Sequence, residues 1–157
     1  MLLFVVMALS VPAGVVLAYD DKTTHPALTQ EIIDLYNLRN PGKAVSPEEK
    51  EWIISGSILE DIPPRWINHF YDPVYNTGWT GANAGTASAE TVQKTSSIFL
   101  SWEKPLSALE WAVNVGIQQT YSIYGGNRSW MQGLNYFARD DKKESYITLG
   151  HILHLVE

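Results

Sequence analysis

Two kinds of side chain in this sequence could hold a metal ion: the imidazoles, and the carboxylates that lie near them in the chain. The imidazoles are His25, His69, His151 and His154. The nearest well-placed carboxylates are Asp20, Asp21, Asp61 and Asp72. Neutral imidazole and carboxylate are good zinc ligands, although none of these residues forms an HExxH motif. A histidine taken singly is more often structural than a ligand, so the spacing of these residues matters.

Asp61 and His69 are separated by eight positions, with Pro63 and Pro64 between them. Because two prolines in a row end a helix, the pair cannot share one helix, but the chain can fold back so that both face one point. His154 lies on the last predicted helix. Its neighbour four positions on would be residue 158, one step past the last residue of the sequence.

The composition fits one globular domain with a real core, because the 157 residues are 45% apolar and 11% aromatic. The net charge of −6 gives no support for a broad basic face, so we expect no stable nucleic-acid partner, although a narrow active-site cleft stays possible.

The chain has no cysteine. A disulfide framework, a disulfide-linked partner and a thiolate zinc finger are therefore excluded, and a metal must use His, Asp, Glu or backbone ligands.

The first 18 residues, "MLLFVVMALSVPAGVVLA", carry no charged side chain and end in a small-residue pattern at Ala18. This pattern predicts a secretory signal peptide over residues 1–18, cleaved before Tyr19, with residues 19–157 outside the cytoplasm. The alternative is a membrane anchor over residues 2–18. That stretch is a little short for a full span and ends at once in "YDDK".

Helical periodicity, capping signals and prolines predict a series of helices that would position these side chains. The predicted helices span residues 26–38, 46–62, 90–103, 105–123, 129–138 and 142–157, with a long loop at 74–90. One apolar face is expected in the first helix, formed by Leu28, Ile32, Leu35 and Tyr36. The last helix is expected to point Tyr146, Leu149, Ile152, Leu153 and Val156 inward.

No segment alternates with a two-residue period between hairpin turns, so the predicted fold is all-α, a multi-helix bundle-like domain with a metal cluster between helices. The last predicted helix is not followed by a Gly, Asn or Pro that would end it, and its apolar periodicity continues up to Glu157. We therefore expect the chain to be cut in mid-helix. A natural helical C-terminus is the alternative.

Two stretches carry a resemblance to a known family. "GSILEDIPPRWINHFYDP" at 56–73 and "YITLGHILHLVE" at 146–157 resemble the zinc-dependent phospholipase C family, which is related to zinc-dependent single-strand nucleases. The resemblance covers most of this chain but only about the first half of a full-length member. It implies a centre of up to three zinc ions.

The resemblance implies a set of zinc ligands, each at a position that matches the family pattern. These are Tyr19, through its free amine and carbonyl, with His25, Asp61, His69 and His154. Tyr19 stands where the family has Trp, and the family's next Asp ligand would be residue 158. Trp66 matches an aromatic position against a choline head group, but Ile62 and Lys22 depart from the rest of that pattern.

The resemblance implies a secreted zinc-dependent phosphoric-ester hydrolase, with a metal-activated water attacking a phosphodiester such as a phospholipid. Asp61 would orient or deprotonate that water. The alternatives are a single-strand nuclease relative and a truncated, non-catalytic fragment of the fold. Because later ligands are missing, we expect the chain as given to bind zinc weakly and to turn over little. His151 is interpreted as a packing residue or as a support behind the ligands, and Asp72 as an acceptor in a turn.

Overall fold

The computed structural model describes residues 23–62, 65–78, 106–119 and 125–157. In these ranges 69% of the residues are helical and no strand occurs, which confirms the all-α prediction. The elements are α1 (Thr24–Arg39), η1 (Pro41–Lys43), α2 (Pro47–Glu60), η2 (Arg65–Asn68), α4 (Ala108–Val113), α5 (Val115–Gln118), α6 (Trp130–Ala138) and α7 (Lys142–His154). Among the described residues, no helix is both long enough and apolar enough to cross a membrane.

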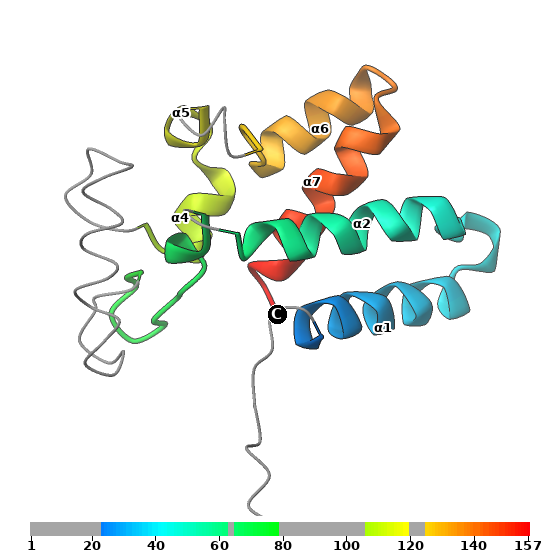
Figure 1. The fold of residues 1–157 in the computed structure, drawn as a ribbon, viewed down its shortest axis with the longest axis horizontal. Helices are drawn as coiled ribbons and strands as arrows, with labels where there is room; N and C mark the ends of the chain where they lie inside the picture. Colours follow the sequence, from blue (N-terminus) through cyan, green and yellow to red (C-terminus); the bar gives the residue numbers. More distant parts are fainter. Residues whose placement is uncertain (1–22, 63–64, 79–105, 120–124) are drawn as a thin grey trace, which may run out of the picture.

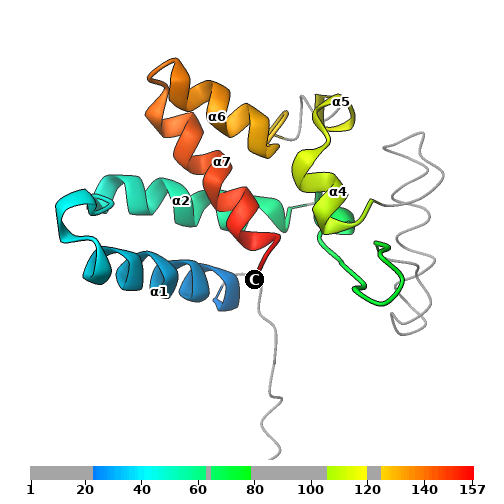
Figure 2. The same cartoon turned by 180° about the vertical axis from the view of Figure 1, so that it is seen from behind.

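The helices form two hairpins that cross. α1 and α2 run side by side, joined through η1, and α6 and α7 form a second hairpin (Figures 1 and 2). α7 packs against α2 more extensively than any other pair of elements does. The end of α7 lies beside the start of α1 (Figure 1). Glu157 accordingly contacts His25 and Thr29 of α1.

Local capping chemistry explains where α2 and α6 begin, and the cap at Ser46 was predicted from the sequence. The Ser46 hydroxyl accepts from the backbone N–H of Glu49, whose carboxylate accepts from the N–H of Ser46 at 2.8 Å. The Ser129 hydroxyl caps α6 in the same way by accepting from the N–H of Gln132. α2 ends at Glu60, so Asp61 is its C-cap residue and is held at the helix end.

Two glycines set the distance between α2 and α7. A Cβ atom added to Gly56 would lie 3.1 Å from the Cα of Gly150 and would overlap the carbonyl oxygen of Ile147. A Cβ atom on Gly150 would overlap the carbonyl oxygen of Ile53. The backbones of the two helices are therefore in direct contact at this crossing. The close approach brings His151 of α7 within hydrogen-bonding reach of Glu60 of α2, with 2.6 Å between Nδ1 and Oε2.

The side of α7 that faces the core is polar, and the prediction for this helix is wrong. Its buried residues are Ile147, Thr148, Gly150, His151 and His154. The residues expected to point inward are half-buried or, for Val156, 74% exposed. The glycine crossing explains the difference, because the face that carries Gly150 is the one that can approach α2.

The predicted apolar face of α1 is also not its buried face. Leu28, Ile32, Leu35 and Tyr36 are all more than 40% exposed. The buried residues of α1 are His25, Thr29 and Ile33, and Thr29 contacts Ser57 of α2. In both helices the apolar stripe was visible in the sequence, but the polar contacts decide which side is buried.

The other predicted boundaries differ in detail. Over the described residues 106–119, the helix predicted at 105–123 is two short helices, α4 and α5, because Ser107 caps α4 and Asn114 adopts extended backbone angles between them. Pro73 to Asn76 form a turn closed by a single bridge between Asp72 and Thr77. α7 ends at His154 rather than at residue 157. The predicted helix 90–103 and most of the loop 74–90 lie outside the described residues.

We predict that Gly150→Ala lowers the free energy of unfolding by about 1–3 kcal/mol, because the new methyl group forces α2 and α7 apart. Helix propensity alone would favour alanine by about 1 kcal/mol, which is the opposite sign. Urea unfolding followed by circular dichroism measures the change. Gly42→Ala is the control, because nothing lies within 4 Å of a Cβ atom at that position. Equal stability of both variants and the unchanged protein would contradict the close crossing.

Candidate metal centre

Three predicted ligands converge at one point, each from a different element. Asp61 follows α2, His69 follows η2, and His154 is the last residue of α7. His69 Nδ1 lies 3.0 Å from His154 Nε2. Asp61 Oδ1 lies 3.3 Å from His69 Nδ1 and 3.4 Å from His154 Nε2. Donor atoms on a tetrahedral zinc with bonds of about 2.0–2.1 Å are about 3.3 Å apart. The three atoms therefore have the separation that one metal ion requires.

Hydrogen bonding within the protein leaves part of this triad unsatisfied. Asp61 Oδ2 and His154 Nδ1 are buried and find no hydrogen-bond partner among the described residues. Burial acts to raise the pKa of Asp61. Hydrogen bonds and charge interactions with His154 and His69 outweigh this effect and hold the pKa well below its usual range. The carboxylate is thus ionised at neutral pH, which is the form that binds a metal.

A second group of possible ligands shares His154. His25 Nδ1 lies 3.1 Å from Glu157 Oε2, and the rings of His25 and His154 are 4.0 Å apart between centroids. His25, His154 and Glu157 place one ligand atom each within 4.8 Å of the others, so this group could also hold a cation. His25, one of the ligands expected from the sequence, therefore lies beside His154 of the triad. Glu157 was missed, because a carboxylate at the last position has no spacing signal.

Glu157 is held by α1 as well as by its own place after α7. Thr29 Oγ1 donates to Glu157 Oε1 at 2.6 Å and lies 3.0 Å from Ser57 Oγ. The Glu157 side chain is only 2% exposed. The carboxylate is therefore fixed beside His25 rather than free on the surface.

Both groups open into one cavity of about 530 Å³. The described residues that line it are His25, Asp61, His69, Phe70, His154, Leu155 and Glu157. Phe70 packs its ring edge-on against His69, with 4.5 Å between centroids. The cavity therefore combines polar groups that could bind a cation with two apolar side chains, Phe70 and Leu155.

Two further residues of the sequence analysis, Trp66 and Asp72, are not among the described lining residues of this cavity. Tyr19 lies outside the described residues. Trp66, in η2, is half-buried and is not among the described lining residues of the cavity. Asp72 accepts from the backbone N–H groups of Val74 and Tyr75, which confirms its predicted role in a turn.

His151 belongs to a buried network next to the triad. Its Nδ1 lies 2.6 Å from Glu60 Oε2, and Arg65 Nε donates to the same oxygen at 2.8 Å. Burial acts to raise the pKa of Glu60, but the Arg65 charge and the His151 contact bring it down to about 2. Burial lowers the pKa of His151 to about 4, although Glu60 opposes this. Glu60 is therefore an anion, and neutral His151 donates to it.

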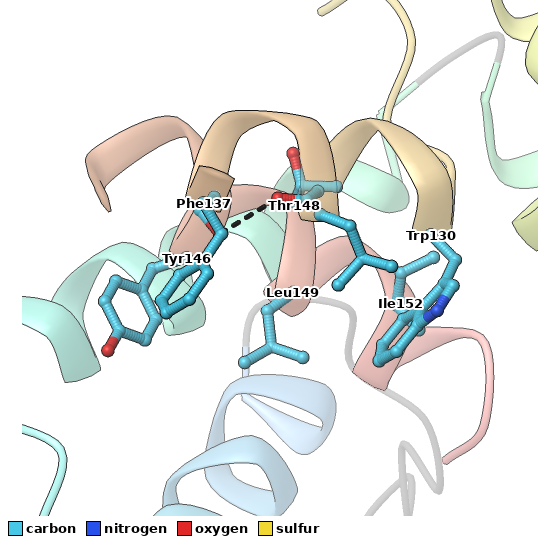
Figure 3. A pocket seen from close by; sticks show the side chains of 9 residues that line it. Trp130, Phe137, Tyr146, Thr148, Leu149 and Ile152 are labelled. Atoms are coloured by element: carbon cyan, nitrogen blue, oxygen red, sulfur yellow. Dashed lines mark hydrogen bonds between the residues drawn. The ribbon is translucent and has the colours of Figure 1, made fainter. Parts of the chain in front are cut away.

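A second cavity, of about 280 Å³, lies between α6 and α7 (Figure 3). It is lined by Trp130, Gly133, Leu134, Phe137, Ser145, Tyr146, Thr148, Leu149 and Ile152. No imidazole or carboxylate is among these described lining residues. Its surface is almost wholly apolar, so the chemistry of metal ligands is confined to the first cavity among the described residues.

Comparison with known proteins returns no family model, no curated protein and no solved structure that matches this chain. The presence of His, Asp and Glu groups that could hold a metal ion therefore rests on geometry alone.

We predict that the free energy of unfolding falls between pH 6.5 and pH 4 because of His151. The unfolded chain binds a proton in this window while buried His151, facing Glu60, Arg65 and Arg128, does not, so stability is lost as pH falls. The loss is on the order of 2 kcal/mol. Urea unfolding at pH 7 and pH 4.5 measures it, with His151→Gln as the comparison. An equal loss in both proteins would show that His151 is not the cause.

Proposed function

We propose that this protein is a zinc-dependent hydrolase of phosphoric esters, in which Asp61, His69 and His154 hold the metal. The observation that carries the proposal is the set of donor separations of 3.0, 3.3 and 3.4 Å among one carboxylate oxygen and two imidazole nitrogens. Three protein ligands and one open position are typical of catalytic zinc sites. The residue types also agree with zinc, which accepts nitrogen and oxygen ligands.

A zinc ion held there would polarise a phosphoryl oxygen and lower the pKa of a coordinated water. The protein supplies the remaining parts. Asp61 offers Oδ2, which is buried without a partner among the described residues, as an acceptor that can orient a water or take its proton. His25 and Glu157, on the other side of His154, can hold a second cation or contact the ester.

The lining of the cavity favours an ester with an apolar part, such as a phospholipid, over a nucleic acid. Phe70 and Leu155 form apolar wall next to the polar groups. None of the described lining residues is Lys or Arg. Binding of single-stranded nucleic acid relies on a positively charged groove, so a nuclease is the weaker alternative. A secretory signal at residues 1–18 would place this activity outside the cytoplasm.

We predict that chelator-treated protein takes up one tightly bound Zn²⁺ per chain and that hydrolysis of a phosphodiester requires it. Isothermal titration calorimetry measures the affinity, and release of nitrophenol from bis(p-nitrophenyl) phosphate measures activity. His69→Ala and Asp61→Asn are expected to weaken zinc binding by about 100-fold or more, because each removes a ligand. The same titration tests the sequence-based expectation of weak binding.

Asp34→Asn is the matched control for Asp61→Asn. Asp34 is an exposed carboxylate of α1 that pairs with Lys50 and lies outside the cavity. The Asp34→Asn substitution should leave zinc affinity and turnover unchanged. Absence of stoichiometric zinc binding would contradict the proposal. Tight zinc binding without hydrolysis of either a lipid or a nitrophenyl ester would support the non-catalytic alternative instead.

A further inference from the structure

Glu60 is a fully buried carboxylate that receives three donors from three elements. Arg65 Nε of η2 and His151 Nδ1 of α7 contact its Oε2 at 2.8 and 2.6 Å. Trp111 Nε1 of α4 donates to its Oε1 at 2.6 Å. The Glu60, Trp111, Arg65 and His151 side chains are each at most 2% exposed. Glu60 therefore joins α2 to three other parts of the chain at one point.

Glu60 and two of its three partners, Arg65 and His151, stand close in sequence to the metal ligands. Glu60 directly precedes Asp61. His151 stands three residues before His154, less than one helical turn away on α7. Arg65 is midway between Asp61 and His69, and the carbonyl of Gly126 also holds its guanidinium group at 3.0 Å. Movement at the junction would therefore move all three ligands.

The ligands themselves need this support. Asp61 is the C-cap residue of α2, His69 follows a short 3₁₀ turn, and His154 ends α7, so each lies where a helix no longer fixes the chain. A functional metal site needs its ligands held within about 0.5 Å of the productive geometry. The glycine crossing brings α2 and α7 together, and the contact from His151 to Glu60 adds a buried hydrogen bond between them.

We propose that Glu60 is the positioning residue of the metal centre, and that it acts through His151 and Arg65 to set the register between the three ligand-bearing segments. This inference rests on the proposed function, because it presumes that Asp61, His69 and His154 hold a metal. The bond from His151 fixes α7 relative to α2. The bond from Arg65 turns the chain after Pro64 back toward α2, which carries His69 to Asp61.

If the Glu60 junction has a purely structural role, substituting one of its residues lowers stability alone. If it positions the ligands, the substitution also changes the metal affinity of the folded protein. Co²⁺ is a suitable probe besides Zn²⁺, because its visible absorption reports the coordination geometry. His151→Gln is the main variant, because it leaves the bonds from Arg65 and Trp111 to Glu60 in place. Glu60→Gln is the stronger variant, to be used if circular dichroism shows that it folds.

Thr148→Val is the matched control on the same helix. Thr148 is 1% exposed, and its hydroxyl accepts from Arg128 at 3.2 Å, so its loss also removes a buried hydrogen bond. All titrations are made at a temperature at which every variant is folded. We expect His151→Gln to weaken Co²⁺ and Zn²⁺ binding by about tenfold and to alter the Co²⁺ spectrum, while Thr148→Val stays within about twofold of the unchanged protein.

Two results would count against these ideas, and they are distinct. If the unchanged protein binds Co²⁺ and Zn²⁺, but His151→Gln binds both with the same affinity and spectrum, Glu60 and His151 have no positioning role. If the unchanged protein binds neither ion, the proposed function itself fails. A parallel fall of stability in His151→Gln and Thr148→Val, with metal affinity lowered only in His151→Gln, supports the inference.

Discussion

The direct backbone contact between α2 and α7 at Gly56 and Gly150 is the constraint on which the rest of this structure depends. Because no side chain separates the helices at this point, His151, which follows Gly150, reaches Glu60, which lies one turn after Gly56, with 2.6 Å between Nδ1 and Oε2. His154 at the end of α7 lies 3.4 Å from Asp61 at the end of α2. The same contact that brings the backbones together therefore places polar, titratable side chains in the interior.

A polar interior is costly unless its groups are paired, and the pairing explains the buried faces of the helices. Thr29, Ser57, Glu60 and His151 are all buried and hydrogen-bonded to one another or to neighbouring elements. Removing one partner of a buried charged pair costs about 3–5 kcal/mol, more than burying one further apolar side chain gains. The paired polar face therefore stays inward although α1 and α7 each also carry an apolar stripe.

Local chemistry was predictable from the sequence, and packing was not. The starts of α2 and α6 follow from Ser46 and Ser129, because a capping hydroxyl and the backbone N–H that donates to it lie within one turn. Asp61, His69 and His154 were predicted together from a resemblance, which encodes long-range proximity that spacing alone lacks. The buried sides of α1 and α7 were mispredicted because periodicity marks a stripe but not its neighbour. Gly56 stands four residues before Glu60 and Gly150 stands directly before His151, so the two glycines lie close in sequence to the residues that join α2 to α7.

Glu60 and Asp61 are adjacent carboxylates whose hydrogen-bonding surroundings differ. Glu60 has three strong donors from the protein and no exposed surface, so it is not accessible to a ligand in the cavity. Asp61 faces two imidazole nitrogens, and one of its oxygens is buried without a partner among the described residues. Asp61 Oδ2 is therefore an acceptor that could bind a metal or a water, whereas the donors around Glu60 belong to the chain itself. This contrast between neighbours supports the proposal that Asp61 is a metal ligand and that Glu60 positions it.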